Sequence, residues 1–401
     1  MPSVFPWTKA TEIPEATASR EQRAKKRSST ATLKTTRKEK QKRLVSEQDL
    51  PFAAEEIVEL PEETLCESVG SSNELNLCTV EVQTTISIVN DMVDSSTQSY
   101  QSKERFSYSD FVTDDKGIHY FTGLETFDKF LFVLNTLGPA ANCLRYLYGA
   151  VSLNVTDQFF LVLIKLRQYI PNFQLSRMFG ISTSEVYNIF FTWVRFMSLQ
   201  WREISIWPSQ DVVRFYSPTD FTSKFPTTRV IIDGTECPIK RPKMPSAQQS
   251  TFSTYKNRNT VKAVIGSTPG GLLSYVSPAF GGSTSDRQIV ERSGLNIMCN
   301  SGDSVMADKG FNVEDLFLPY NISLNIPTFF RKKNRMTSET VRKDKKISSK
   351  RIHIERIIGL GKTYKILKNC MNSTETMLSG DIIFVCYMLC NFRSGIVSRN
   401  A

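Results

Sequence analysis

Apolar side chains recur at three- and four-residue spacings in the middle of the chain, beginning near residue 120. In FTGLETFDKFLFVLNTL this spacing predicts a helix with one apolar face, because residues three and four apart lie on the same side of a helix. A second helix is predicted to begin at Thr156 and Asp157, which are capping residue types, and to end before Pro171. The apolar face of the first helix contains Phe127, Phe130, Leu131, Leu134 and Leu137. The pattern therefore predicts an all-helical domain over residues 120–205.

The segment QLSRMFGISTSEVYNIFFTWV within this domain has a distinctive turn. It predicts a short helix over 174–179, a turn at Gly180 and a longer helix through Val194, with Ser182 or Thr183 as its N-cap. This is the layout of a helix-turn-helix, whose second helix presents its first residues to the major groove of DNA. An ordinary helical hairpin has the same turn chemistry and is the alternative. The residues predicted to face DNA are Thr183, Ser184, Tyr187 and Asn188.

Short β-type segments replace the helical pattern after residue 228. The segment RVII at 229–232 is a predicted buried strand that ends at Asp233–Gly234, and SVMA at 304–307 is another that ends at Asp308. The other predicted elements are a hairpin of strands at 261–267 and 272–277, a helix at 287–292 and a strand at 324–326. This order predicts an α/β fold over residues 228–396, a ribonuclease-H-like mixed sheet of the retroviral-integrase type.

Asp233 and Asp308 are thus predicted to lie at the ends of neighbouring buried strands. Two such carboxylates repel one another unless a positive charge lies between them, and a divalent metal ion supplies that charge. Metal ions held by shared carboxylates can activate the attacking oxygen and stabilise the leaving oxygen at a phosphodiester. For either Asp alone the simpler interpretation is a turn residue, since Asp-Gly and Asp-Lys-Gly are common after strands.

The net charge of the chain, +10, is divided unevenly among its segments. Residues 1–50 carry twelve basic and six acidic side chains, and residues 51–110 carry two basic and twelve acidic ones. Because this part lacks apolar periodicity and is rich in Ser, Thr, Glu and Gln, residues 1–110 are predicted to be a disordered tail with an acidic linker. Its basic clusters, RAKKR and TRKEKQKR, suit a nuclear import signal, a nucleic-acid-binding arm or simply a solvated tail.

A second basic segment, residues 331–370, carries fourteen basic and three acidic side chains. Within it, KRIHIERIIGLGK spaces Arg351, Glu355 and Lys362 along one face of a predicted helix. Glu355 is placed to complete a metal site, while Arg351 and Lys362 are placed to hold DNA phosphates beside it. A salt-bridge ladder on the protein surface is the alternative.

Composition excludes several other classes of protein. The longest apolar run, IIFVCYMLC at 382–390, is too short to span a membrane, and the first residues do not have the pattern of a secretory signal. A reducing compartment and free thiols are therefore expected. The eight cysteines are scattered and only two histidines are present, which excludes zinc fingers within this chain.

Four motifs in sequence order resemble the DDE-type transposases of PIF/Harbinger and related eukaryotic DNA transposons. They are DGTE at 233–236, GGSTSD at 281–286, ADKGF at 307–311 and RIHIERIIGLGK at 351–362. FTGLETF at 121–127 and the helix-turn-helix resemble the DNA-binding region found upstream of that nuclease domain. The resemblance covers roughly residues 120–392, which is most of the part of the chain that is expected to fold.

The resemblance implies roles for individual residues. Asp233, Asp308 and Glu355 would be catalytic, and together with Asp286 they would bind Mg²⁺ or Mn²⁺; Lys362 would contact DNA. Asp286 lies at a predicted helix start, where capping alone also explains it. The chain departs from the family pattern at Ser348, where bacterial relatives have Tyr, and at Phe311, where Tyr is common. Neither departure removes a metal ligand.

The resulting hypothesis is a nuclear, metal-dependent endonuclease that acts at transposon ends, binds DNA and is compatible with a homo-oligomer. The competing hypothesis is a domesticated DNA-binding protein that no longer cuts DNA. A third hypothesis, a scaffold that docks partners through residues 1–110, would leave Asp233, Asp308 and Glu355 unexplained. PSVFPW at 2–7 is similar to the closing segment of THAP zinc domains, which some transposases of this group carry. No Cys or His precedes it, so it would be a remnant.

Overall fold

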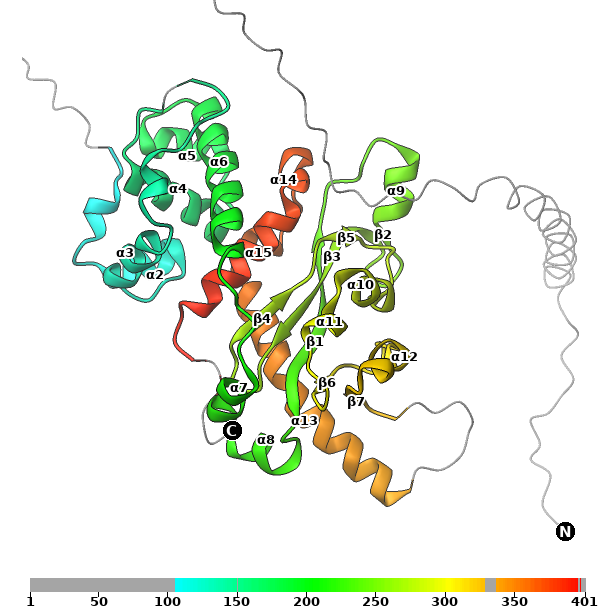
Figure 1. Ribbon diagram of the computed structural model, residues 1–401. Coiled ribbons are helices and arrows are strands. Elements are labelled where there is room, and N and C mark those ends of the chain that lie inside the picture. The colour runs from blue at the N-terminus through cyan, green and yellow to red at the C-terminus, as the bar shows by residue number, and fades with distance from the viewer. Residues whose placement is uncertain (1–104, 150, 329–336, 396, 398–401) are drawn as a thin grey trace, which may run out of the picture. The chain divides into compact units, whose positions relative to one another are not determined.

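The computed structural model describes residues 105–149, 151–328, 337–395 and 397. Its first part is a group of helices (Figure 1). These helices pack around aromatic side chains. The ring of Phe106 lies with its centroid 5.4 Å from those of Phe111 and Phe121. Phe106 belongs to the segment predicted to be disordered, so the folded part begins earlier than expected; residues 1–104 lie outside the described residues. The elements are η1 Tyr108–Phe111, α2 Asp115–Thr122, α3 Phe127–Asn135, η2 Pro139–Asn142, α4 Val155–Gln168, α5 Asn172–Phe179 and α6 Thr183–Arg202.

The ends of two of these helices differ from prediction. Helix α4 begins at Val155 because Asn154, rather than Thr156, is the N-cap and its side chain accepts a hydrogen bond from the Asp157 N–H. The Asp157 carboxylate instead accepts hydrogen bonds from Ser107 and from the Tyr108 N–H. Helix α6 is capped by Ser182, as predicted, but it continues past residue 194 to Arg202. Its extra turns bury Met197 and Trp201 in the core.

Two short helices lie in the segment between the helical part and the sheet, which the sequence did not predict. They are α7 Gln210–Tyr216, capped by the Ser209 side chain, and α8 Thr219–Lys224, preceded by Pro218. The serines and the three prolines of this segment favoured a connector, and each helix is too short to show a periodic apolar face.

The second part is a mixed sheet with strand order β2-β3-β1-β6-β7, and β4 and β5 also pair with β3. Strand β1 is antiparallel to β3 and parallel to β6, and β6 is parallel to β7. The order and the placement of the hairpin, the helix and the following strands agree with the predicted α/β layout. The strands are β1 Thr228–Pro238, β2 Phe252–Ser253, β3 Arg258–Ser267, β4 Leu273–Val276, β5 Phe280–Gly281, β6 Ser304–Met306 and β7 Ser323–Asn325.

Strand β1 does not end at Asp233, and this prediction was wrong. Its pairing with β3 continues through Asp233 opposite Ile265 as far as Pro238 opposite Thr260. Asp-Gly is a turn signal when it is judged locally, but here a long partner strand keeps the backbone extended through it. Asp233 therefore projects from the middle of a strand rather than from its end.

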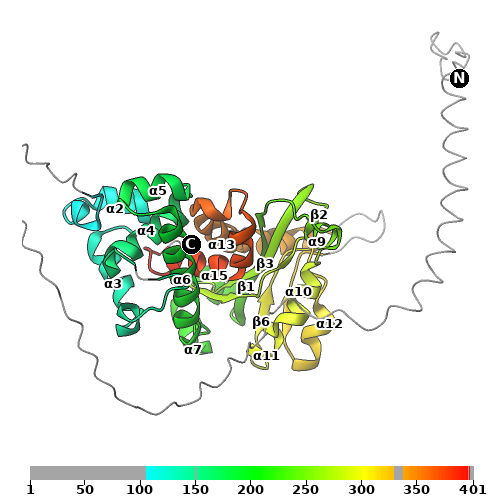
Figure 2. The same ribbon diagram turned by 90° about the horizontal axis from the view of Figure 1, so that it is seen from above.

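Alternate residues of β1 face two separate cores. Ile231 and Cys237 belong to the larger core, which includes α13 and α15, whereas Val230 and Ile232 belong to the smaller core around α10 and α12. Figure 2 shows these two pairs of helices on either side of β1 and β3. The helices are α9 Pro245–Thr251, α10 Asp286–Ser293, α11 Leu295–Met298, α12 Glu314–Phe317, η3 Leu318–Tyr320, α13 Ser338–Gly361, η4 Lys365–Leu367, α14 Ser373–Met377 and α15 Ser379–Asn391.

The apolar run at 382–390 forms most of α15, and its side chains are buried. Helix α15 packs against α6 and β4, so its apolar character is explained by the core. Within the described part of the chain, no helix has the length and apolarity that crossing a membrane requires.

A buried ion pair connects the helical part to the sheet part. Lys165 of α4 lies 3.1 Å from Glu375 of α14, and both side chains are 5% exposed. The Tyr169 hydroxyl also donates to Glu375, at 2.9 Å. Together with the shared core of α6 and α15, this pair fixes the two parts against one another.

Candidate active site

Asp233 lies on the face of β1 that is turned toward α13, because it is in phase with Ile231 and Cys237. Its Oδ1 accepts a hydrogen bond from the Gly234 N–H at 2.8 Å. Burial raises the pKa of Asp233 to about 6; the Gly234 N–H and the charge of Arg351 lower the pKa, while the negative charges of Asp308 and Glu355 raise it further. Asp233 is thus electrostatically coupled to both of the other predicted catalytic acids.

Asp308 follows β6 by two residues, next to β1 in the sheet. Its Oδ1 accepts hydrogen bonds from the Lys309 N–H at 2.7 Å and from the Arg351 Nη1 at 2.8 Å. The Asp308 side chain is 47% exposed, so solvent and ligands can reach it.

Glu355 lies one turn after Arg351 on α13, and its Oε1 is 3.6 Å from the Arg351 Nη2. The guanidinium of Arg351 therefore contacts both Asp308 and Glu355. The Arg351 side chain is only 11% exposed, whereas that of Glu355 is 55% exposed. Sequence reasoning expected Arg351 to hold DNA phosphates; in the structure it is inside the site and paired with two of the acids.

The three acids agree in chemistry with a magnesium or manganese site, since carboxylate oxygens are the ligands these ions prefer. Their positions in this structure are not those of a complete metal site. Among the described residues, no three acidic, His or Cys side chains are grouped closely enough to hold a metal ion. The cation within the group is Arg351. Its Nε is buried and has no hydrogen-bond partner within the described part of the chain.

Asp286 lies apart from these acids, on the other side of β1. It is the first residue of α10, whose N-cap is Ser285, and its Oδ1 pairs with the Lys262 Nζ at 2.9 Å. A Cβ at Gly234 would lie 2.8 Å from the same Oδ1, so the glycine of DGTE allows this carboxylate to approach the strand. The structure does not bring Asp286 together with the other three predicted ligands.

Lys362 is the C-cap residue of α13, and its positive charge lies close enough to the Cys237 thiol of β1 to act on it. Its side chain is partly exposed. Within the described residues its ammonium forms neither a hydrogen bond nor an ion pair, so it is available to an anion beside the site.

Three of the residues predicted to face DNA lie together at the start of α6. Thr183 and Ser184 are exposed, and with Tyr187 they line a hollow of about 560 Å³. Tyr148 and Asn172 complete its lining. Sequence reasoning missed these two residues: Tyr148 lies in an irregular segment with no periodic signal, and Asn172 begins the preceding helix.

Asn188, the fourth predicted reader, is not on the surface. Its side chain is 1% exposed, accepts a hydrogen bond from the Leu147 N–H at 3.0 Å and donates one to the Tyr148 carbonyl at 2.8 Å. The prediction of an exposed Asn188 was wrong because helical spacing does not reveal that residues 147–148 cover that face of α6. Asn188 instead holds Tyr148 at the edge of the hollow.

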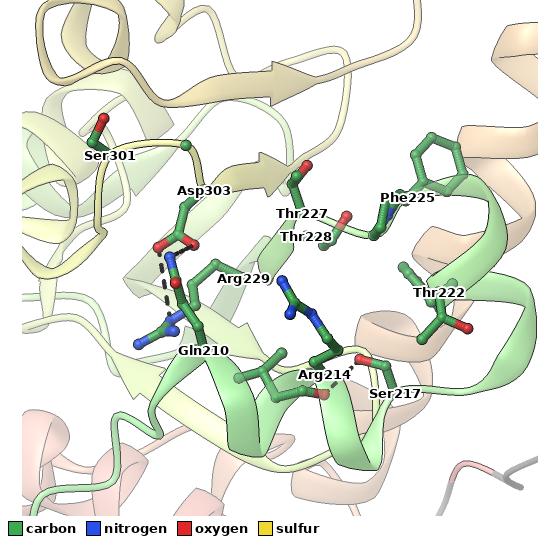
Figure 3. Close-up of a pocket in the computed structure, with 14 residues that line it drawn as sticks. Gln210, Arg214, Ser217, Thr222, Phe225, Thr227, Thr228, Arg229, Ser301 and Asp303 are labelled. Atoms are coloured by element: carbon green, nitrogen blue, oxygen red, sulfur yellow. Dashed lines mark hydrogen bonds and ion pairs between the residues drawn. The ribbon is translucent and has the colours of Figure 1, made fainter.

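A smaller cavity, about 190 Å³, opens beside the first residues of β1 (Figure 3). Asp303 accepts a hydrogen bond from Gln210 at 2.8 Å and lies 3.9 Å from the Nε of Arg229. The side chain of Arg214 points into the opening. None of the predicted site residues lines this cavity.

Comparisons with protein families agree with this geometry. A family model for the DDE superfamily endonuclease matches residues 232–391, and a model for the helix-turn-helix of DDE superfamily endonuclease matches residues 151–201. No curated protein and no solved structure matches the chain. The first match defines the sheet part as an endonuclease-type domain and implies a ribonuclease-H-like fold for it.

The second match covers α4 to α6 and confirms the helix-turn-helix prediction. With both matches in the expected order, the chain is a member of the DDE superfamily of endonucleases and transposase-derived proteins, with a helix-turn-helix upstream of the nuclease domain.

Proposed function

We propose that this protein is a divalent-metal-dependent DNA endonuclease of the PIF/Harbinger type, which cuts phosphodiester bonds at transposon ends in the nucleus. One observation carries the proposal: Asp308, in the segment after β6, and Glu355 of α13 both contact Arg351. Asp233 of β1 lies on the strand face turned toward α13, where the charges of Arg351, Asp308 and Glu355 act on its carboxyl. Mutually repelling acids from three separate elements are costly to hold together unless their charge is used.

The residues have distinct parts in this proposal. Asp233, Asp308 and Glu355 would hold Mg²⁺ or Mn²⁺, which would supply a Lewis acid and an activated oxygen nucleophile. Lys362 binds a phosphate of the DNA next to the site, because its ammonium is free of partners among the described residues. Thr183, Ser184 and Tyr187 contact base edges from α6, and Asn188 supports them by holding Tyr148.

The test compares two Asp→Asn variants on supercoiled DNA that carries the transposon's terminal repeats. With Mg²⁺ or Mn²⁺, the unaltered chain is expected to nick this DNA, and Asp308→Asn is expected to abolish nicking while DNA binding is retained. Asp315→Asn is the matched control, because Asp315 is an exposed acid of the same domain that pairs only with Arg287 among the described residues. Equal nicking by Asp308→Asn and the unaltered chain would end the assignment.

A second function, a domesticated DNA-binding protein without nuclease activity, is favoured by one observation. Arg351 already contacts Asp308 and Glu355, so their charges are partly neutralised without a metal ion. In that case the unaltered chain binds terminal-repeat DNA but does not nick it with either ion, and Asp308→Asn has no effect on binding. The two functions are therefore separated by the same assay.

A further inference from the structure

The segment at 237–285 contains no Asp or Glu, although it carries six Lys and Arg residues. It forms the end of β1, α9, the β2–β3 hairpin and β4. Five of the six basic side chains are exposed. The five are Lys240, Arg241, Lys243, Lys256 and Arg258. We call these five residues, together with α9 and the β2–β3 turn, the basic hairpin.

An aromatic ring stands at the tip of the basic hairpin. Tyr255 lies in the turn between β2 and β3 and is 83% exposed. The Lys256 Nζ lies 4.5 Å from its ring centroid, and Asn257 closes the turn with a left-handed backbone, φ 51°. A tyrosine ring in solvent with a lysine ammonium over one face has its other face free for a planar group to stack on.

Hydrogen bonds and close packing against β3 hold α9 and the β2–β3 turn of the basic hairpin together. The buried Asn259 side chain donates hydrogen bonds to the Gln248 carbonyl at 3.0 Å and to the Thr251 Oγ1 at 2.8 Å. A Cβ at Gly282 would lie 2.0 Å from the Thr260 Oγ1 and 2.8 Å from the Thr251 carbonyl oxygen, so only glycine allows α9 to pack here. The two glycines of GGSTSD therefore fix the hairpin on the sheet, and the surface is preformed.

The basic hairpin and the candidate active site share two strands. Asp233 pairs with Ile265 of β3, and Arg258 begins the same strand seven residues away. At about 3.3 Å per residue the separation is about 23 Å. A nucleic-acid strand that advances about 3.4 Å per nucleotide spans this distance in about seven nucleotides. Figure 1 shows α9 and β2 at the end of the sheet beyond α10.

We propose that the basic hairpin is a second nucleic-acid-binding surface, which holds backbone phosphates with Lys243, Lys256 and Arg258 and stacks an unpaired base on Tyr255. This inference rests on the proposed endonuclease function, and it adds that the DNA bound beyond the cut site has a single-stranded or unstacked region. Nucleic acid fits the surface better than an acidic protein does, because every base offers a face to an exposed ring, whereas carboxylates do not.

The phosphate contacts are tested by the salt dependence of DNA binding, measured with the full-length chain in EDTA by fluorescence anisotropy. The triple variant Lys243→Gln, Lys256→Gln, Arg258→Gln is expected to reduce the slope of log affinity against log salt concentration by about 2 to 3. The matched control, Lys116→Gln, Arg214→Gln, Arg292→Gln, removes three exposed charges at other places and is expected to leave the slope unchanged.

The stacking contact is tested with two probes, a blunt duplex and the same duplex with a single-stranded extension. Tyr255→Ala is expected to weaken binding of the extended probe about tenfold and to leave blunt-duplex binding nearly unchanged. Tyr255→Phe keeps the ring and is expected to bind both probes as the unaltered chain does. Because Tyr255 is exposed, its loss is not expected to change the thermal midpoint, which is measured for every variant.

Three outcomes would overturn the inference. An unchanged slope in the triple variant, with metal-dependent nicking intact in the unaltered chain, overturns the hairpin assignment alone. Tighter binding of polyglutamate than of DNA, together with no effect of Tyr255→Ala, assigns the surface to an acidic protein instead. Failure of the unaltered chain to bind any DNA overturns both this inference and the proposed function.

Discussion

Arg351 is the residue through which the predicted catalytic acids are connected. It is 2.8 Å from Asp308, 3.6 Å from Glu355 and close enough to Asp233 to lower the pKa of that carboxyl. A guanidinium and a divalent cation can each neutralise the negative charges of these carboxylates, so the two compete for the same place. Under the proposed function, we expect metal binding to displace the Arg351 guanidinium from Asp308.

Replacing Arg351 should therefore strengthen metal binding. With Arg351→Gln we expect the affinity for Mn²⁺, measured by isothermal titration calorimetry, to rise at least tenfold. A unit charge about 4 Å away contributes about 1 kcal/mol in water and about 4 kcal/mol near a protein surface, and about 1.4 kcal/mol corresponds to tenfold. Arg356→Gln is the control: Arg356 is exposed on the same helix, and solvent screens its charge. Equal affinities in the two variants would show that Arg351 does not compete for the site.

At the same scale, sequence reasoning named Asp233, Asp308 and Glu355 but misplaced two neighbours. The four-residue spacing places Arg351 and Glu355 on one face of a helix, but it does not show whether that face is exposed or turned toward β6. Spacing alone therefore could not show that Arg351 pairs with Asp308 inside the site. Asn188 was assigned to the surface because the segment that covers it, around Leu147, has no periodic pattern. Contacts between segments distant in sequence decided both cases.

At the scale of the elements, α13 is the one that carries both Arg351 and Glu355, and it is positioned by a close contact with α15. A Cβ at Gly361 would lie 2.3 Å from the ring of the buried Tyr387, so the two helices can approach only at a glycine. This explains the second glycine of IIGLGK without any reference to DNA. At Gly359, two residues earlier, a Cβ would meet nothing within 4 Å.

The two glycines give a matched pair of substitutions. Gly361→Ala is expected to lower the free energy of unfolding by about 1–3 kcal/mol, because it overpacks the α13–α15 contact. Gly359→Ala is expected to raise it by about 0.5–1 kcal/mol, because alanine is a better helix former and the site is open. Urea denaturation of both variants measures the difference, and the same sign for both would contradict the packing account.

The main strands and several of the longer helices could be predicted from the sequence, and the differences have two physical causes. Alternating and β-branched residues placed the hairpin of β3 and β4, and the strands β6 and β7, close to their observed bounds. The continuation of β1 through Asp233–Gly234 could not be predicted locally, because it depends on pairing with β3. Helices α7 and α8 were missed because each is too short to show a periodic apolar face.

On the scale of the whole molecule, the helix-turn-helix part is docked on the nuclease part through a buried ion pair and a shared core. Lys165 and Glu375 come from helices α4 and α14, and both are almost fully buried. Burial lowers the pKa of Lys165, and the charge of Glu375 opposes that shift. Loss of either partner would leave the charge of the other one uncompensated inside the protein.

Glu375→Gln should therefore destabilise the whole described fold rather than one part of it. We expect a loss of about 3–5 kcal/mol in the free energy of unfolding, because the Lys165 ammonium stays buried without its counter-charge. Arg195→Gln, which removes an ion pair to Asp381 whose arginine is 59% exposed, is the control and should cost at most about 1 kcal/mol. A loss of less than about 1 kcal/mol for Glu375→Gln would contradict the coupling.

The most direct test of the central claim is the anomalous scattering of crystals grown with Mn²⁺. We predict a manganese peak within coordination distance of the carboxylates of Asp233, Asp308 and Glu355, with the Arg351 guanidinium moved away from Asp308. A peak at Asp286 alone, or a site with Arg351 still bound to Asp308 and no manganese, would contradict the account.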